Sequence, residues 1–267
     1  MKRTAIIAVS AVLISGASSA VAQDVLPRPL GPMESFRFTS GSGVGASWGS
    51  VQIGPYHGVM TSDPTQPQVT LYCVDFAHTI HNNQTWNANI TTLEGTDFGN
   101  TRANDVAKYK KAAFLSSLFD SYSDYVGVSY GSGTFGNKKQ VWSGLHAAIW
   151  TIMTPGFGNP WDPFLPDGQW VTDKNLADAM AAPFLALADA AMRNNYAGTG
   201  MDFGEWSVVS DKCIGTTVAT TACPQVGGVQ EYLVHTVVPE PETVVLMMTG
   251  LLALAVGAFK FRMLDTG

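Results

Sequence analysis

Two apolar segments without a charged side chain lie near opposite ends of this chain of 267 residues, at positions 4–14 and 243–259. A soluble domain would have to bury both segments, yet only a short tail follows the second one and could help to cover it. These segments therefore constrain the fold more than any other feature. They leave residues 23–238 to form the globular part, a length that suits one domain.

The amino-terminal segment has the three parts of a secretory signal peptide. Two basic residues precede the apolar stretch, and Ala20 and Ala22 are the small residues that a signal peptidase accepts before its cleavage site. We therefore predict a signal peptide at residues 1–22, removed so that Gln23 begins the mature chain. The alternative, a membrane anchor, is disfavoured because the apolar stretch is too short to cross about 30 Å of hydrocarbon comfortably.

The carboxyl-terminal apolar segment is flanked by different residues. Pro239, Glu240 and Pro241 precede it, and two basic residues follow it. As a helix it would be about 26 Å long, which is the lower end of what crosses a bilayer. Because basic residues favour the cytoplasmic side, we predict a transmembrane helix at 243–259 with the globular part outside the cytoplasm. The alternative is a helix in the core of a soluble domain, but no polar face interrupts the run.

The tail at residues 239–267 resembles the PEP-CTERM sorting signal of exported bacterial proteins. In that family a Pro-Glu-Pro motif, a membrane-spanning segment and a basic cluster are recognised by an exosortase. The family usually ends in a run of arginines, whereas Phe261 separates Lys260 from Arg262 here. The resemblance implies that signal peptidase and exosortase process the chain and that its helix anchors it in the membrane before processing. It also implies a destination at the cell surface or in an extracellular matrix rich in exopolysaccharide.

Hydrophobic periodicity predicts the fold class of residues 23–238. Alternating and β-branched stretches predict strands near both ends of this region, at 35–39, 50–53, 56–60, 69–76, 206–210 and 229–237. Apolar residues at helical spacing predict three helices between them, at about 105–118, 138–153 and 173–196. Pro183 is expected to kink or split the third helix. The order indicates an α+β fold, an antiparallel β-sheet or barrel with a helical insertion.

Charge and motifs exclude several classes of function. The net charge is −6, so a basic face for nucleic acid is not expected. The sequence lacks a phosphate-binding loop and a nucleotide-binding glycine motif, and it predicts no cofactor. His78 and His81 fall at a predicted strand end without further ligands at suitable spacing, so no metal site is predicted.

The three cysteines divide into a pair and a single residue. Cys213 and Cys223 flank a short stretch of small residues, and an exported chain folds in an oxidising compartment. We therefore predict a disulfide between them. Cys73 remains inside a predicted strand, where a free cysteine is commonly a small buried hydrophobe.

The residues around Cys73 show a second resemblance to a known family. Tyr72 and Cys73, together with residues 145–150, are similar to the thioester domains of bacterial surface adhesins, in which a strand cysteine and a helix glutamine condense. His146 occupies the glutamine position, and imidazole has no acyl carbon. Gln140 is six residues earlier and would point away, about 240° around the helix. The resemblance implies a thioester-domain-like fold in which Cys73 and His146 form a degenerate pair without the bond.

Three functions remain open from the sequence. The preferred one is an exported surface or matrix protein with a non-catalytic adhesive or structural role. The first alternative is a carbohydrate-binding module for exopolysaccharide, using three of the aromatic side chains of the loop at 157–170, namely Trp161, Phe164 and Trp170. The second is a cysteine-dependent enzyme in which His146 activates Cys73 and Asp75 is the nearest candidate for the orienting group.

Overall fold

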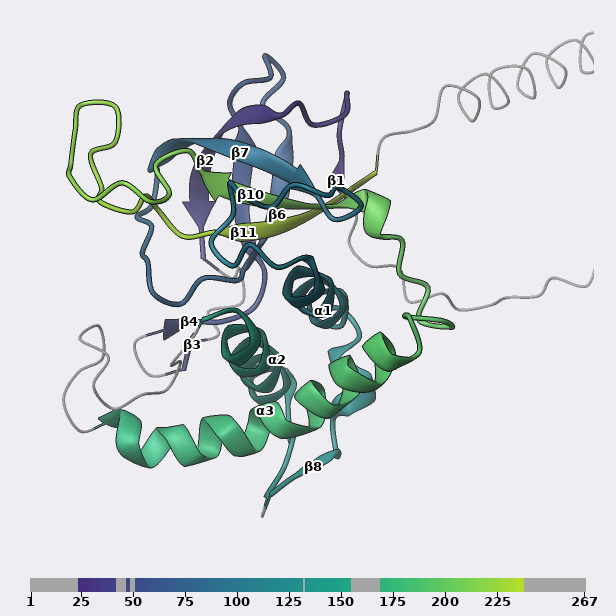
Figure 1. The fold of residues 1–267 in the computed structure, drawn as a ribbon. Coiled ribbons are helices and arrows are strands. Elements are labelled where there is room, and N and C mark those ends of the chain that lie inside the picture. Colours follow the sequence, from purple (N-terminus) through teal and green to yellow (C-terminus); the bar gives the residue numbers. More distant parts are fainter. Residues whose placement is uncertain (1–23, 42–46, 49–50, 132, 155–168, 238–267) are drawn as a thin grey trace, which may run out of the picture.

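The structure is a computed structural model that describes residues 24–41, 47–48, 51–131, 133–154 and 169–237 (Figure 1). The predicted signal peptide, the sorting tail with its helix at 243–259 and most of the aromatic loop at 157–170 lie outside these residues. Within the part of the chain that is described, no helix is both long and apolar enough to cross a membrane.

Six antiparallel strands close into a β-barrel (Figure 1). They are β2 (Met33–Ser40), β5 (Tyr56–Met60), β6 (Gln68–Cys73), β7 (Thr85–Thr92), β10 (Trp206–Asp211) and β11 (Tyr232–Val237). Around the barrel the order is β2, β5, β6, β11, β10 and β7, and the pairing of β7 with β2 completes the circuit. Closure therefore pairs both edges of each of these six strands, which removes the edge that an open sheet exposes.

Alternating side chains fill the barrel. In β2, Phe36 and Phe38 are buried while their neighbours reach the outer face. The Phe36 ring stacks on Trp86 with 5.6 Å between centroids, and Trp86 lies 6.0 Å from the ring of Tyr232. These aromatic rings come from three strands, so they hold opposite walls of the barrel together through a common apolar core.

Several short elements complete the β structure. β1 (Asp24–Val25) pairs in parallel with the end of β11, so the first and last described residues lie side by side. β3 (Ser47–Trp48) pairs with β4 (Val51–Gln52), and β8 (Ser129–Tyr130) pairs with β9 (Gly133–Thr134). Two 3-10 helices are also present, η1 (Tyr122–Tyr125) and η2 (Phe203–Glu205).

Three α-helices pack on one side of the barrel, as Figure 1 shows. They are α1 (Val106–Ser117), α2 (Lys138–Met153) and α3 (Gln169–Arg193). Asp105 caps α1 by accepting hydrogen bonds from the backbone N–H groups of its first turn, and Asn137 caps α2 in the same way. Such caps satisfy backbone donors that have no partner inside the helix, and they fix where each helix begins.

Helix α2 lies at the centre of the helical layer. It packs against both α1 and α3, and its residues are buried on every side from Val141 to Trp150. The close approach of α3 requires a glycine at position 144. A Cβ atom there would lie 2.8 Å from the carbonyl oxygen of Met180 and 2.8 Å from the ring of Phe184.

The described residues confirm an antiparallel β structure with a helical insertion, and of the two predicted forms, sheet or barrel, it is the barrel. The predicted bounds of the helix at 138–153 and of the strand at 56–60 are confirmed, and of the two candidate caps for the first helix, Asn104 and Asp105, the structure has Asp105. Gln140 does lie away from the core, because its side chain accepts a hydrogen bond from the backbone N–H of Gly136 at 2.6 Å.

Of the two expected effects of Pro183, a kink or a split, the split does not occur: α3 is one element through Pro183, because its packing on α2 offsets the backbone hydrogen bond that proline cannot donate. Other details of the prediction were wrong. The third helix begins before Asp173 and ends at Arg193. Strand β6 ends at Cys73 instead of continuing to Phe76, and strand β7 was not predicted.

Candidate functional site

Cys73, the last residue of β6, is fully buried beside Tyr232 of the neighbouring strand. Its thiol donates a hydrogen bond to the carbonyl oxygen of Asp75 at 3.3 Å. Burial, followed by the nearby negative charge of Asp75, raises the pKa of the thiol to about 12. The residue is therefore a neutral thiol at physiological pH, which is not the nucleophilic form.

His146 on α2 is also fully buried. Its Nδ1 atom accepts a hydrogen bond from the backbone N–H of Gly54 at 2.9 Å, so the ring proton belongs on Nε2. Burial lowers the pKa of His146 to about 3. The ring stacks on Trp150 at 4.7 Å and meets the Phe119 ring edge-on at 4.8 Å. His146 is thus a neutral ring packed among aromatic side chains.

The bond to His146 depends on the backbone of Gly54. This residue has φ = +91°, a conformation that favours glycine. A Cβ atom at this position would lie 2.1 Å from the indole of Trp142. Only glycine therefore lets the segment before β5 approach α2 closely enough to donate to His146.

The two members of the predicted degenerate pair lie against one side chain. The Trp150 indole stacks on His146 and also acts on the thiol of Cys73, whose pKa it lowers slightly against the larger effect of burial. Since the thiol and the imidazole are both neutral, this arrangement does not form a thiolate–imidazolium pair. The three side chains form a packed part of the core that joins β6 to α2.

Asp75, the nearest candidate for an orienting group in the enzyme alternative, pairs with two basic side chains. Its Oδ2 atom lies 2.7 Å from Nε of Arg102 and 2.8 Å from Nδ1 of His78. Arg102 also donates to the carbonyl oxygens of Gly227 at 2.7 Å and Val229 at 2.6 Å. These contacts tie the segment after β6 to the segments that precede α1 and β11, so Asp75 has a structural role.

A second buried carboxylate, Glu231, extends this network. Its Oε2 atom accepts from the hydroxyl of Tyr109 at 2.5 Å, and its Oε1 atom accepts from the backbone N–H of Arg102 at 3.0 Å and from the hydroxyl of Ser210. Burial raises the pKa of Glu231 in spite of these bonds. The partners come from α1, β10 and the segment that precedes α1, so Glu231 holds the helical insertion on the barrel.

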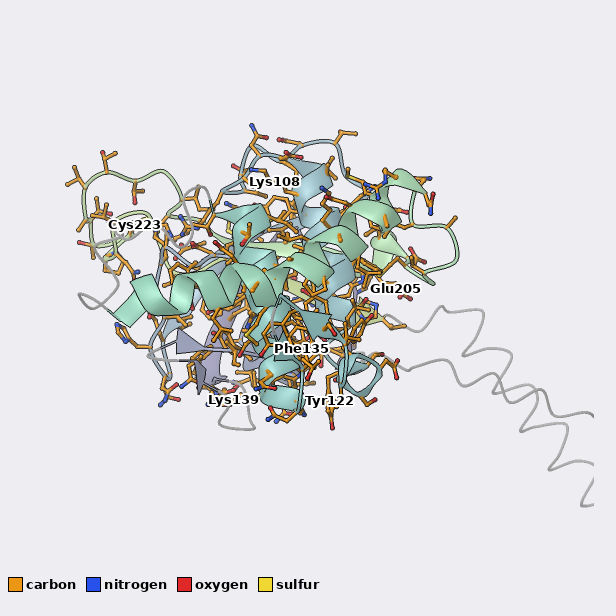
Figure 2. All side chains as sticks on the ribbon, turned by 90° about the horizontal axis from the view of Figure 1, so that it is seen from below. Lys108, Tyr122, Phe135, Lys139, Glu205 and Cys223 are labelled. Atoms are coloured by element: carbon orange, nitrogen blue, oxygen red, sulfur yellow. A yellow bond between two sulfur atoms is a disulfide. The ribbon has the colours of Figure 1, made fainter. Side chains whose placement is uncertain are left out.

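The predicted disulfide between Cys213 and Cys223 is confirmed, with 5.5 Å between the two Cα atoms. The bond closes a loop whose residues 217–222 are all exposed. The loop stands out from the barrel at its edge, where Cys223 is labelled in Figure 2. Among the three cysteines, only Cys73 is therefore a free thiol.

The histidines considered for a metal are separated. His78 belongs to the Asp75 network, whereas His81 is exposed. Within the described ranges, no group of three or more histidine, cysteine, aspartate or glutamate side chains is arranged to hold a metal ion.

Comparison of this chain with protein-family models, with curated proteins and with solved structures finds no match.

Proposed function

We propose that this chain is exported and acts without catalysis, as an adhesive or structural protein at the cell surface or in the extracellular matrix. In this proposal signal peptidase removes residues 1–22. The segment at 243–259 anchors the chain in the membrane until an exosortase recognises the tail at 239–267. The sequence of the two ends supports the export route.

The disulfide of the exposed loop is the observation that carries the proposal. Disulfides persist in compartments that oxidise thiols and are rare in the cytosol. Cys213 and Cys223 close a loop that stands out from the barrel, where reductants of the cytosol would reach it. A bond at this position therefore supports a folded domain that works outside the cytoplasm.

The arrangement of the chain ends agrees with this proposal. Strand β1 pairs with the end of β11, so the described residues nearest to the two predicted processing sites lie side by side on the barrel. The loop closed by Cys213 and Cys223 lies on the opposite side of the barrel (Figure 1). A domain tethered through its carboxyl end would therefore point this loop away from the membrane.

The state of Cys73 and His146 supports a non-catalytic role. A nucleophilic cysteine needs a lowered pKa and access to substrate, whereas Cys73 has a raised pKa and no exposed surface. A general base needs a pKa near the working pH, whereas the pKa of His146 falls to about 3.

Cell fractionation tests the proposal in a Gram-negative host that has an exosortase. Three forms are compared: the full chain, a chain ending at residue 238, and a variant with Pro239→Ala and Pro241→Ala. We expect the full chain at the surface or in the medium, the truncated chain free in the periplasm, and the double variant retained in the inner membrane. Recovery of all three forms in the cytoplasm would overturn the proposal.

A further inference from the structure

A small cleft lies between the barrel and the disulfide-closed loop. Its walls are the start of β7, the end of β10 and the chain on either side of Cys223. Its volume is about 100 Å³, well below the roughly 300–1,000 Å³ of pockets for drug-sized ligands. The cleft therefore suits one unit of a larger chain molecule that remains mostly outside it.

The lining of this cleft is rich in groups that bind hydroxyls. Gln84, Asn87 and Gln225 contribute amide side chains. The two glutamines meet through a long hydrogen bond of 3.4 Å, and Gln225 donates a second long bond of 3.3 Å to the carbonyl oxygen of Thr79. Bonds of this length are weak, so the two NH2 groups can turn to the hydroxyl groups of a ligand at little cost. The amide oxygens of Gln84 and Asn87 are already engaged, because they accept hydrogen bonds from the backbone N–H of His81 at 2.9 Å and from the hydroxyl of Ser35.

One charged side chain of the cleft is open to a ligand. Lys212 lines the cleft, is exposed and has no salt bridge to another described residue. The neighbouring acid, Asp211, is buried and accepts hydrogen bonds from the backbone N–H groups of Cys213 at 2.8 Å and Val229 at 2.9 Å. The aspartate is thus occupied within the loop, while the ammonium group of Lys212 remains available.

The walls of the cleft are fixed before a ligand arrives. Trp86 is 5% exposed and its ring packs inside the barrel, which holds the start of β7 in place. The disulfide fixes the opposite wall. A preformed site loses little conformational entropy on binding, which favours weak but specific recognition of a repeating polymer.

We propose that this cleft binds a sugar unit that carries a carboxylate, a uronic acid residue of an acidic polysaccharide. The amides would contact its hydroxyl groups, and Lys212 would pair with its carboxylate. The inference rests on the proposed function, because a polysaccharide ligand requires that the domain work outside the cell. The disulfide-closed loop that lines the cleft lies on the side of the barrel away from the chain ends (Figure 1), and this position suits such a ligand.

Binding of tetragalacturonate to the exported full chain, purified in mild detergent, tests the inference by calorimetry. We expect a Kd of about 0.1–1 mM, as for one shallow subsite. The fully methyl-esterified tetramer has the same hydroxyls without the charge and should bind about fivefold more weakly or worse. Lys212→Met should remove this preference for the free acid.

Lys139→Met is the matched control, since Lys139 is exposed on α2 away from the loop (Figure 2). It should bind the free acid as the parent does. Absence of binding up to about 10 mM, equal binding of acid and ester, or an unchanged affinity of Lys212→Met would each overturn the inference. Cell fractionation reports separately on export. A protein that reaches the surface but does not bind the acid would therefore overturn this inference and leave the proposed function standing.

Discussion

Removing the disulfide should reduce the stability of the domain by an amount that its loop length sets. We consider the double variant Cys213→Ala and Cys223→Ala, because alanine leaves no unpaired polar atom at the half of the bond that is buried. The two cysteines are 10 residues apart in the sequence. Cross-linking a loop of about this length removes roughly 9 cal/mol/K of entropy from the unfolded chain, which is about 2.7 kcal/mol at 25 °C.

Urea unfolding, followed by the fluorescence of the buried tryptophans, measures this difference. With an m value of about 2 kcal/mol/M, the midpoint of the variant should fall by about 1 M urea. Reductant supplies an internal control, since it should lower the unfolding midpoint of the parent to that of the variant and leave the midpoint of the variant unchanged. A midpoint within about 0.2 M of the oxidised parent would refute the reasoning.

Three further predictions follow from the core and the pH-sensitive contacts. Cys73 should resist maleimide in the native protein at pH 7.5 and react after unfolding; native labelling would contradict its burial. Stability should fall as the pH drops from 4.5 towards 2, because two hydrogen bonds from Arg28, at 2.6 and 2.9 Å, lower the folded-state pKa of Glu34 on β2 to about 2. The loss is on the order of 2 kcal/mol after solvent screening, and Glu34→Gln should flatten this part of the stability curve. Gly54→Ala should cost at least about 2 kcal/mol more in unfolding free energy than Gly127→Ala; both have φ = +91°, but only the first creates a clash, so equal losses would refute the packing argument.

Local features of the fold could be predicted because neighbouring residues encode them. The cap at Asp105 and the apolar spacing of residues 138–153 fixed two helices correctly. Strand β7 escaped prediction although Trp86, Ala88 and Ile90 alternate, because the polar residues between them give the stretch the composition of a loop. The alternation was the signal that could have found it.

Long-range features could not be predicted from neighbouring residues. Closure of the barrel depends on the pairing of β6 with β11, and the sequence of neither strand indicates which strand it pairs with. The same holds for Asp75, Arg102 and Glu231, which are far apart in the sequence and which the fold brings together. The network of Asp75 was therefore not predicted, and neither was the role of Gly54, whose backbone holds His146.

The thiol state of the chain inside living cells tests export most directly. Cells are quenched in acid, denatured, and treated with a maleimide mass tag, and the amino terminus of the recovered chain is sequenced. We expect one tag, on Cys73, and a chain that begins at Gln23. Three tags on a chain that still begins at Met1 would show a reduced, unprocessed protein and would contradict the account.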